Sequence, residues 1–332
     1  MHKLAEIGEN TVASAIDSVV TLDIGTRGVI RKLYRASAEK VENESVTLEA
    51  AQRLKETVAD GDRVLIMTGF IVPPWNIQET DGPSGAASLA RAIDIAMGGR
   101  PFLLIEKDSE KILSSTCRAI GLNVMQPSRL KNEGLKHSAA IMDFTLDANA
   151  APTAANLLLD ELNPSAVISV EKSGRNCVGE YHNMKGFNVS AHHAKVEAIV
   201  SEARKRKILT IGVGDGGNEV GMGNIAQMVA ESVPYAAQCQ CPCGRGIAAE
   251  SEVDLLVTAA ISNWGAYGIA ANLTRITGKP ALHTPEMEAS MLTSMAHEGA
   301  IDGIVGFPCL SVDGVPFEIH LAIIEILWKM AL

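Results

Sequence analysis

The chain has 332 residues, of which 47% are hydrophobic, so it is long enough to bury a large core. Its formal net charge of −10 argues against nucleic acid and anionic membranes as partners, because both favour basic surfaces. Residues 1–20 lack the basic-then-apolar order of a signal peptide, so we expect a cytoplasmic protein.

Short β-branched segments alternate with alanine-rich helical segments along most of the chain. This order predicts an α/β fold with a mostly parallel, doubly wound (Rossmann-like) sheet in three layers and peripheral helices. We expect one domain over residues 1–332, with 1–45 as a helical and loop arm. The predicted strands are 63–68, 101–105, 138–143, 166–170, 208–213 and 254–258. The predicted helices are 48–59, 85–97, 109–120, 153–161, 193–205, 218–231, 266–276, 285–298 and 317–330.

Carboxylates follow three of these strands at the point where the apolar run ends. Glu79 and Asp81 follow the first strand, Glu171 follows the fourth, and Asp215 and Glu219 follow the fifth. Because the carboxyl ends of parallel strands meet at one edge of a sheet, these acids are expected to share a pocket. Such a cluster favours a hard cation, Mg²⁺ or Mn²⁺. Each acid taken alone is also explained as a helix cap or a solvated loop residue.

Three glycines between residues 212 and 217 have the G-x-G-x-x-G spacing of a dinucleotide-binding loop. The acids Asp215 and Glu219 within the same loop would repel a pyrophosphate. A dinucleotide-binding fold requires an acid at the end of a second strand about 20 residues further on. That position is Glu231 here, and no predicted strand ends there. We therefore expect no NAD and interpret the loop as part of the acidic pocket.

Three of the six cysteines form the motif CQCPC at 239–243. Without an export signal, all six are expected to be reduced thiols. Alternate cysteines on an extended segment suit a soft metal, but zinc sites usually use paired Cys-x₂-Cys motifs and the chain has no second pair. A metal site and a plain loop both stay open, and the loop is the simpler interpretation.

Four motifs in consistent order resemble the D-glutamate cyclase family over about residues 60–275. They are ETDGPSGAASLARA (79–92), VEKSGRNCVGEYHNMKG (170–186), GVGDGGNEVGMG (212–223) and SNWGAYG (262–268). The resemblance implies an α/β enzyme that converts D-glutamate to 5-oxo-D-proline and water. Its small-molecule partner is then an acidic amino acid.

This reaction needs a proton acceptor, a proton donor and stabilisation of negative charge. We assign Glu171 and Glu219 to acid and base catalysis, in either order, and Glu79, Asp81 and Asp215 to the metal. The glycine loop and a helix N-terminus near Asn218 are expected to donate N–H groups to the substrate carboxylate. The full set of predicted substrate-binding residues is Gly214, Gly216, Gly217, Asn218, Arg175, Asn176, Tyr181, Asn183 and Asn263.

Several of these residues also have simpler interpretations. Tyr181 and His182 are equally well explained as ordinary lid residues. Trp264 is more often a core residue than a pocket wall. The pair His192 and His193 is expected to face solvent at a helix start.

Two other classes of function stay open on the sequence. The same carboxylates would suit a Mg²⁺- or Mn²⁺-dependent phosphomonoester hydrolase. A non-catalytic protein that binds an amino acid or a nucleotide is the third interpretation. The oligomeric state is also left open, a homo-oligomer included.

Overall fold

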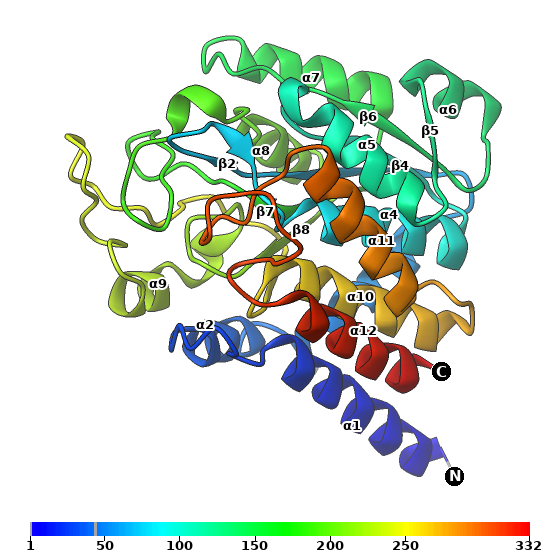
Figure 1. Cartoon of the computed structure of the whole chain (residues 1–332). Coiled ribbons are helices and arrows are strands. Elements are labelled where there is room, and N and C mark those ends of the chain that lie inside the picture. The colour runs from blue at the N-terminus through cyan, green and yellow to red at the C-terminus, as the bar shows by residue number, and fades with distance from the viewer. Residues whose placement is uncertain (1, 43–44) are drawn as a thin grey trace.

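Seven parallel strands form the central sheet of the protein, in the order β5-β6-β4-β1-β7-β8-β9 (Figure 1). The computed structural model describes residues 2–42 and 45–332; residues 1, 43 and 44 of the predicted N-terminal arm lie outside this range. The sheet strands are β1 (Arg63–Gly69), β4 (Arg100–Leu104), β5 (Asn123–Met125), β6 (Ser138–Met142), β7 (Ala166–Lys172), β8 (Leu209–Gly214) and β9 (Leu255–Thr258). A short antiparallel hairpin, β2 (Ile71–Val72) and β3 (Ile77–Gln78), follows β1.

The helices divide between the two faces of this sheet according to the direction in which the chain moves. From β1 the chain moves through α4 and α5 toward the β5 edge of the sheet. From β5 it moves in the opposite direction, toward the β9 edge, through α6, α7, α8 and α9. Because crossover connections are right-handed, these two groups cover opposite faces. Their bounds are α4 (Pro83–Met97), α5 (Glu110–Ala119), α6 (Pro127–Glu133), α7 (Ala151–Leu162), α8 (Glu197–Lys205) and α9 (Ala226–Ser232), with single 3₁₀ turns at Lys107–Ser109, Ser190–His192 and Met222–Ile225.

The same reversal creates the functional edge of the sheet. The chain leaves β1 toward one face and leaves β7, its neighbour, toward the other. The loops that follow these two strands therefore separate and leave a crevice at their carboxyl ends, which is where open α/β sheets bind ligands.

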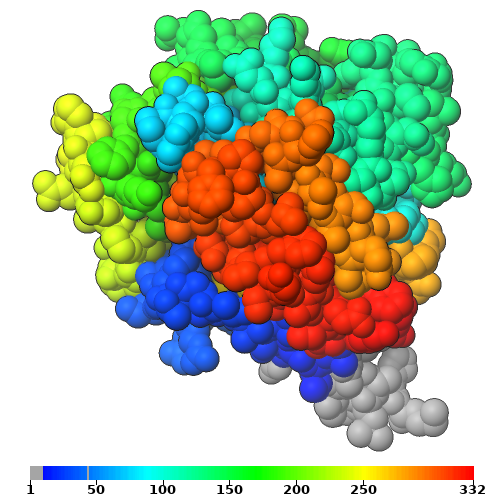
Figure 2. Space-filling view, viewed as in Figure 1, coloured from blue at the N-terminus to red at the C-terminus, as the bar shows by residue number. Residues whose placement is uncertain are grey.

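The helix α10 (Ser262–Thr277) is the central helix of the α4 face and is buried from residue 262 to 274. It contacts the strands β7, β8 and β9 as well as four helices: α4, α3 (Val46–Thr57), α1 (His2–Val20) and α12 (Phe317–Ala331). A side chain at Gly265 would place its Cβ 2.7 Å from Val213 of β8, so glycine is required for this close approach. The segments from the two ends of the chain, α1 and α12, lie together, as Figure 2 shows in blue and red.

The remaining elements are α2 (Ile30–Ala38), which contacts β9, and α11 (Pro285–His297), which contacts α5 and α12. Within the described residues, no helix is long and apolar enough to cross a membrane.

The α/β fold with a mostly parallel sheet in three layers is confirmed, and each of the six predicted strands is present, with ends within two residues of the prediction. Three predicted helices differ. The helix expected at 266–276 begins four residues earlier, at Ser262. The helix expected at 193–205 begins only at Glu197, and His193 is buried instead of facing solvent. No helix begins at Asn218; a 3₁₀ turn at 222–225 and the short α9 replace it.

Candidate functional site

A cavity of about 750 Å³ opens at the carboxyl ends of β1, β7 and β8. Four carboxylates reach it from different parts of the chain: Glu79, Glu171, Asp215 and Asp313. The guanidinium of Arg27 lies among them. Exposed apolar side chains, including those of Trp75, Phe187 and Ile304, form its outer rim. The interior of the cavity is thus acidic and its mouth is apolar.

Glu171 is placed in the cavity by an irregularity in the sheet. The pairing of β1 with β7 shifts between Thr68 and Gly69, so that Glu171 is an extra residue in β7. Its φ angle is 44°, a left-handed conformation that a residue with a side chain adopts at a cost. One carboxylate oxygen, Oε2, accepts a hydrogen bond of 2.6 Å from the Ser262 hydroxyl. A bulge that aims a strained carboxylate into a cavity is typical of a functional position.

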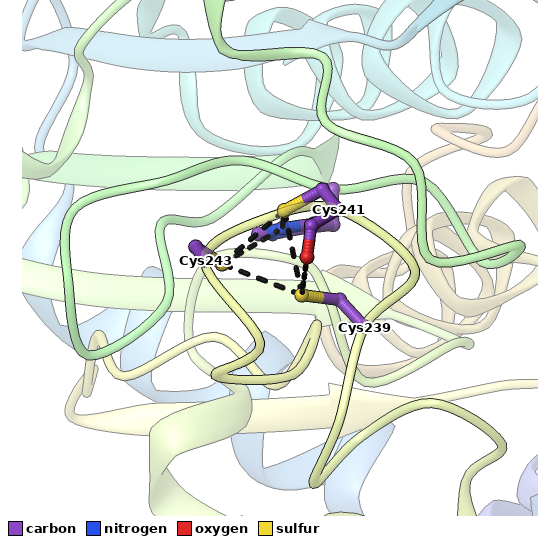
Figure 3. Close-up of side chains that lie close together, drawn as sticks. Cys239, Cys241 and Cys243 are labelled. Carbon is purple, nitrogen blue, oxygen red and sulfur yellow. Dashed lines mark hydrogen bonds between the residues drawn. The ribbon is translucent and has the colours of Figure 1, made fainter.

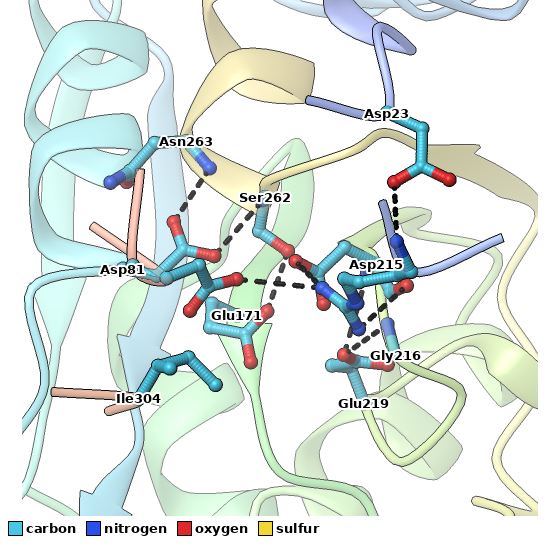
Figure 4. A network of polar contacts seen from close by, with 12 residues as sticks. Asp23, Asp81, Glu171, Asp215, Gly216, Glu219, Ser262, Asn263 and Ile304 are labelled. Carbon is cyan, nitrogen blue, oxygen red and sulfur yellow. Dashed lines mark hydrogen bonds and ion pairs between the residues drawn. The ribbon is translucent and has the colours of Figure 1, made fainter. Parts of the chain in front are cut away.

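Asp81 connects the cavity to the N-terminus of α10, as Figure 4 shows. Its carboxylate accepts the backbone N–H groups of Ser262 (3.0 Å) and Asn263 (2.9 Å), the first two residues of that helix. In return, the side-chain oxygen of Asn263 accepts the N–H groups of Gly82 (3.0 Å) and Gly85 (2.6 Å) at the start of α4. The N-terminus of each helix is thereby capped by a side chain from the other segment, and the helix dipoles stabilise negative charge here.

The glycine loop after β8 does not present its N–H groups to the cavity. The carboxylate of Glu219 accepts the N–H groups of Gly216 and Gly217, each at 2.7 Å. Glu219 is itself fixed by an antiparallel bridge to Ser173, which follows β7. The helix expected to start near Asn218 is absent, and the N–H groups of Gly216 and Gly217 are bound by Glu219. Binding of a substrate carboxylate by this loop stays a prediction.

Two residues of the site were not predicted, although one lies in a segment with a recognisable pattern. Arg27 donates to Oδ2 of Asp215 at 2.8 Å and lies 3.5 Å from Asp313. It belongs to LDIGTRGV (22–29), which has the acidic and glycine-rich composition of a site loop. Asp313 lies in a loop fixed by buried Asp302, whose carboxylate accepts the N–H groups of Ile304 and Gly314.

Burial and mutual repulsion raise the pKa of four carboxyl groups of the site and make them weak acids. Burial and the neighbouring charge of Asp215 raise the pKa of Asp81 to about 8 and that of Glu219 to about 7. Burial raises the pKa of Glu171 well above its usual range, and the charges of Glu219 and Asp215 add to this. Glu79 is affected in the same direction, by burial and then by Asp81. Several of these groups therefore hold a proton near neutral pH, as acid and base catalysts do.

The donor set fits a hard divalent cation. Carboxylate oxygens of Asp81, Asp215 and Asp313 lie within 4.8 Å of one another, as do those of Glu171, Asp215 and Glu219. Asp81 and Asp215, two of the three predicted metal ligands, are thus brought together, and Asp313 joins them. The third, Glu79, lies in the same cavity but outside both of these closer groups.

The predicted substrate-binding residues separate into two regions. Asn183 and Asn218 line the acidic cavity, and Gly214, Gly216 and Gly217 form the loop behind it. Asn263 caps α4. The remaining three lie elsewhere: Arg175 pairs with Glu250, Asn176 donates to the carbonyl of Gly246, and the hydroxyl of Tyr181 donates to Glu197.

The chain is similar to known proteins of one family. The protein family described as D-glutamate cyclase-like, C-terminal, matches residues 16–328. The human protein D-glutamate cyclase, mitochondrial, is 25% identical over 351 aligned residues, which cover 96% of this chain and 51% of the human one. The chain therefore spans about half the length of this curated relative.

Proposed function

The chain belongs to the D-glutamate cyclase-like family, and from this we propose that it is a lyase that converts D-glutamate to 5-oxo-D-proline and water. The observation that carries the proposal is the convergence of buried, weakly acidic carboxyl groups on one cavity, with Glu171 held in a strained conformation among them. The cavity volume of about 750 Å³ is ample for an amino acid.

The proton balance of the reaction suits such a group of acids. The substrate nitrogen begins as an ammonium and ends as a lactam N–H, so it loses two protons. The γ-carboxylate loses one oxygen, which leaves as water with those same two protons. The C–N bond forms as the C–O bond breaks, and no proton is gained or lost overall. A carboxyl group that takes a proton from nitrogen and returns it to oxygen is therefore sufficient.

Glu171 is best placed for this role. Its Oε2 is held by Ser262 at 2.6 Å, and the residue lines the cavity. Glu219, the second predicted acid or base, has both oxygens bound by loop N–H groups, so it supports the site electrostatically in this conformation. Holding the substrate folded, with its amine beside its own γ-carbon, supplies the proximity that cyclisation needs.

Charge complementarity orients the substrate in this proposal. Ion pairs with Asp215 and Asp313 hold the cationic side chain of Arg27 at the cavity wall. In this proposal Arg27 attracts a substrate carboxylate, and Glu79, which lines the same cavity, accepts a hydrogen bond from the ammonium group. Recognition of both the carboxylate and the ammonium group of the substrate would fix its orientation in the cavity.

Asp81, Asp215 and Asp313 would hold Mg²⁺ or Mn²⁺, and Glu79 would add a nearby oxygen donor. When bound, this cation would supply charge neutralisation for the γ-carboxylate, which is otherwise a poor electrophile. The roles of Glu171 and Arg27 follow from their own contacts.

Incubation of the purified chain with D-glutamate or L-glutamate tests the proposal, with 5-oxoproline measured by chiral chromatography and mass spectrometry. Each arm is run with Mn²⁺, with Mg²⁺ and with EDTA, and a phosphomonoester is included as a further substrate. We expect 5-oxo-D-proline from D-glutamate, with a lower rate in EDTA. No 5-oxoproline from either enantiomer would overturn the proposal, and release of phosphate would favour the hydrolase alternative.

A further inference from the structure

Three cysteines and a histidine meet outside the acidic cavity. The sulfur atoms of Cys239, Cys241 and Cys243 lie 3.3–3.4 Å from one another and point inward from one loop (Figure 3). The Nε2 atom of His182, from the segment that follows β7, lies 3.1 Å from the sulfur of Cys241 and 3.6 Å from that of Cys243. The four ligand atoms all lie within 4.8 Å of one another.

From this arrangement we propose that Cys239, Cys241, Cys243 and His182 bind one structural Zn²⁺ ion. Zinc with three thiolates and one imidazole is four-coordinate, with metal–sulfur bonds of about 2.3 Å. The corresponding tetrahedron has sulfur–sulfur edges of about 3.8 Å, so the sulfurs need to separate by only about 0.4 Å. On binding, each thiol gives up its proton, and Zn²⁺ takes the place of the three protons.

The surroundings suit a closed structural site. His182 is fully buried and Cys239 nearly so, and each of the four donors comes from the protein, which leaves no open position for a substrate. Soft thiolates select zinc over the Mg²⁺ or Mn²⁺ that the acidic cavity suits. Hydrogen bonds already hold the two segments together, since the N–H of Gln240 donates to the carbonyl of Gly186 at 2.9 Å.

The position of the cluster gives this site a role in the cavity wall. Asn183, Met184 and Phe187, which follow His182 directly, line the acidic cavity. The side chain of Asn218 in the glycine loop also donates to the carbonyl of His182 at 2.8 Å. A metal ion at His182 would therefore anchor one wall of the cavity to the loop at 235–247.

Elemental analysis of the purified chain tests the site. We expect about one zinc per chain, lost in Cys241→Ser and Cys243→Ser. Cys177→Ser is the matched control: Cys177 lies in the same segment as His182, is exposed, and should leave the zinc content unchanged. Replacement of zinc by Co²⁺ should give a thiolate charge-transfer band and intense tetrahedral d–d bands. Asp215→Asn should leave these bands unchanged, because it alters only the acidic cavity.

Two further measurements keep the test independent of activity. Counting of thiols in the unfolded protein should give six, since zinc ligation leaves no disulfide. Trypsin cleavage at exposed Lys185 should be faster in Cys241→Ser than in Cys177→Ser, because the wall loses its anchor. A chain that contains no zinc, binds no Co²⁺ through sulfur, or has a disulfide among these three cysteines would overturn the proposal.

Discussion

Replacement of Arg27 by glutamine tests whether the loop at 22–29 is held against the site by charge. Arg27 lies 2.8 Å from an oxygen of Asp215, where two unit charges attract by ~6 kcal/mol at an effective dielectric constant of about 20. Its side chain is 26% exposed, so water screens part of this attraction. Loss of one partner of a buried pair costs about 3–5 kcal/mol, and solvent reduces this to about 2–3 kcal/mol here.

Urea denaturation at pH 7.5 measures this loss in the free energy of unfolding. The matched control is Arg204→Gln, because Arg204 pairs with Glu252 at 3.3 Å on the surface and should change the free energy by less than about 1 kcal/mol. A double-mutant cycle with Asp215→Asn should give a coupling energy of about 2 kcal/mol. An Arg27→Gln chain as stable as the wild type would refute the reasoning, and so would a coupling energy near zero.

Three further changes probe the loops around the cavity. The folded-state pKa of Glu219 is raised from its ordinary value of 4.5 to about 7, so the proton it holds stabilises the fold at pH 5, and this stability is lost as the pH rises through 7. Relative to Glu219→Gln, the wild type should therefore lose about 3 kcal/mol of unfolding free energy between pH 5 and pH 8. A wild type that becomes more stable than the variant as the pH rises would contradict this. Gly216→Ala should lower activity about tenfold or more. The added Cβ would lie 2.6 Å from the sulfur of Met184 and 2.8 Å from Oε1 of Glu219, so the loop would have to move. Full activity of this variant would show that the position of the glycine loop does not matter for activity. Asn263→Ala should lower the unfolding free energy by about 2–4 kcal/mol in urea, because two N–H groups at the start of α4 lose their acceptor; a change smaller than that of Arg204→Gln would contradict the capping role.

The sheet could be predicted from the sequence because its central strands are buried on both faces. Such strands appear as continuous apolar runs, as Leu65 to Met67 in β1 and Val167 to Ile168 in β7 do. The edge strand β5 has three residues, Asn123–Met125, and none is fully buried, so it leaves no comparable pattern. The predicted helix at Asn218 failed because Glu219 satisfies the loop N–H groups that a helix would otherwise use.

The neighbourhood of five acids could be predicted, because they lie at or beyond the carboxyl ends of β1, β7 and β8, which are adjacent in the sheet: Glu79, Asp81, Glu171, Asp215 and Glu219. Arg27 and Asp313 could not be placed in this way, because they come from loops near the two ends of the chain and only tertiary packing brings them to Asp215. For the same reason, the fourth donor of the cysteine cluster, His182, could not be paired with the CQCPC motif from spacing alone.

The most direct test of the central claim is the rate at which the wild type and Glu171→Gln form 5-oxo-D-proline from D-glutamate labelled with oxygen-18 in its γ-carboxylate. The wild type should release one labelled oxygen as water and keep the other in the lactam. Glu171→Gln should form product at least about a hundredfold more slowly with an unchanged unfolding free energy, whereas the surface variant Glu252→Gln should match the wild type. Product formation by Glu171→Gln at the wild-type rate, or no product from the wild type with Mn²⁺ and Mg²⁺ supplied, would contradict the account.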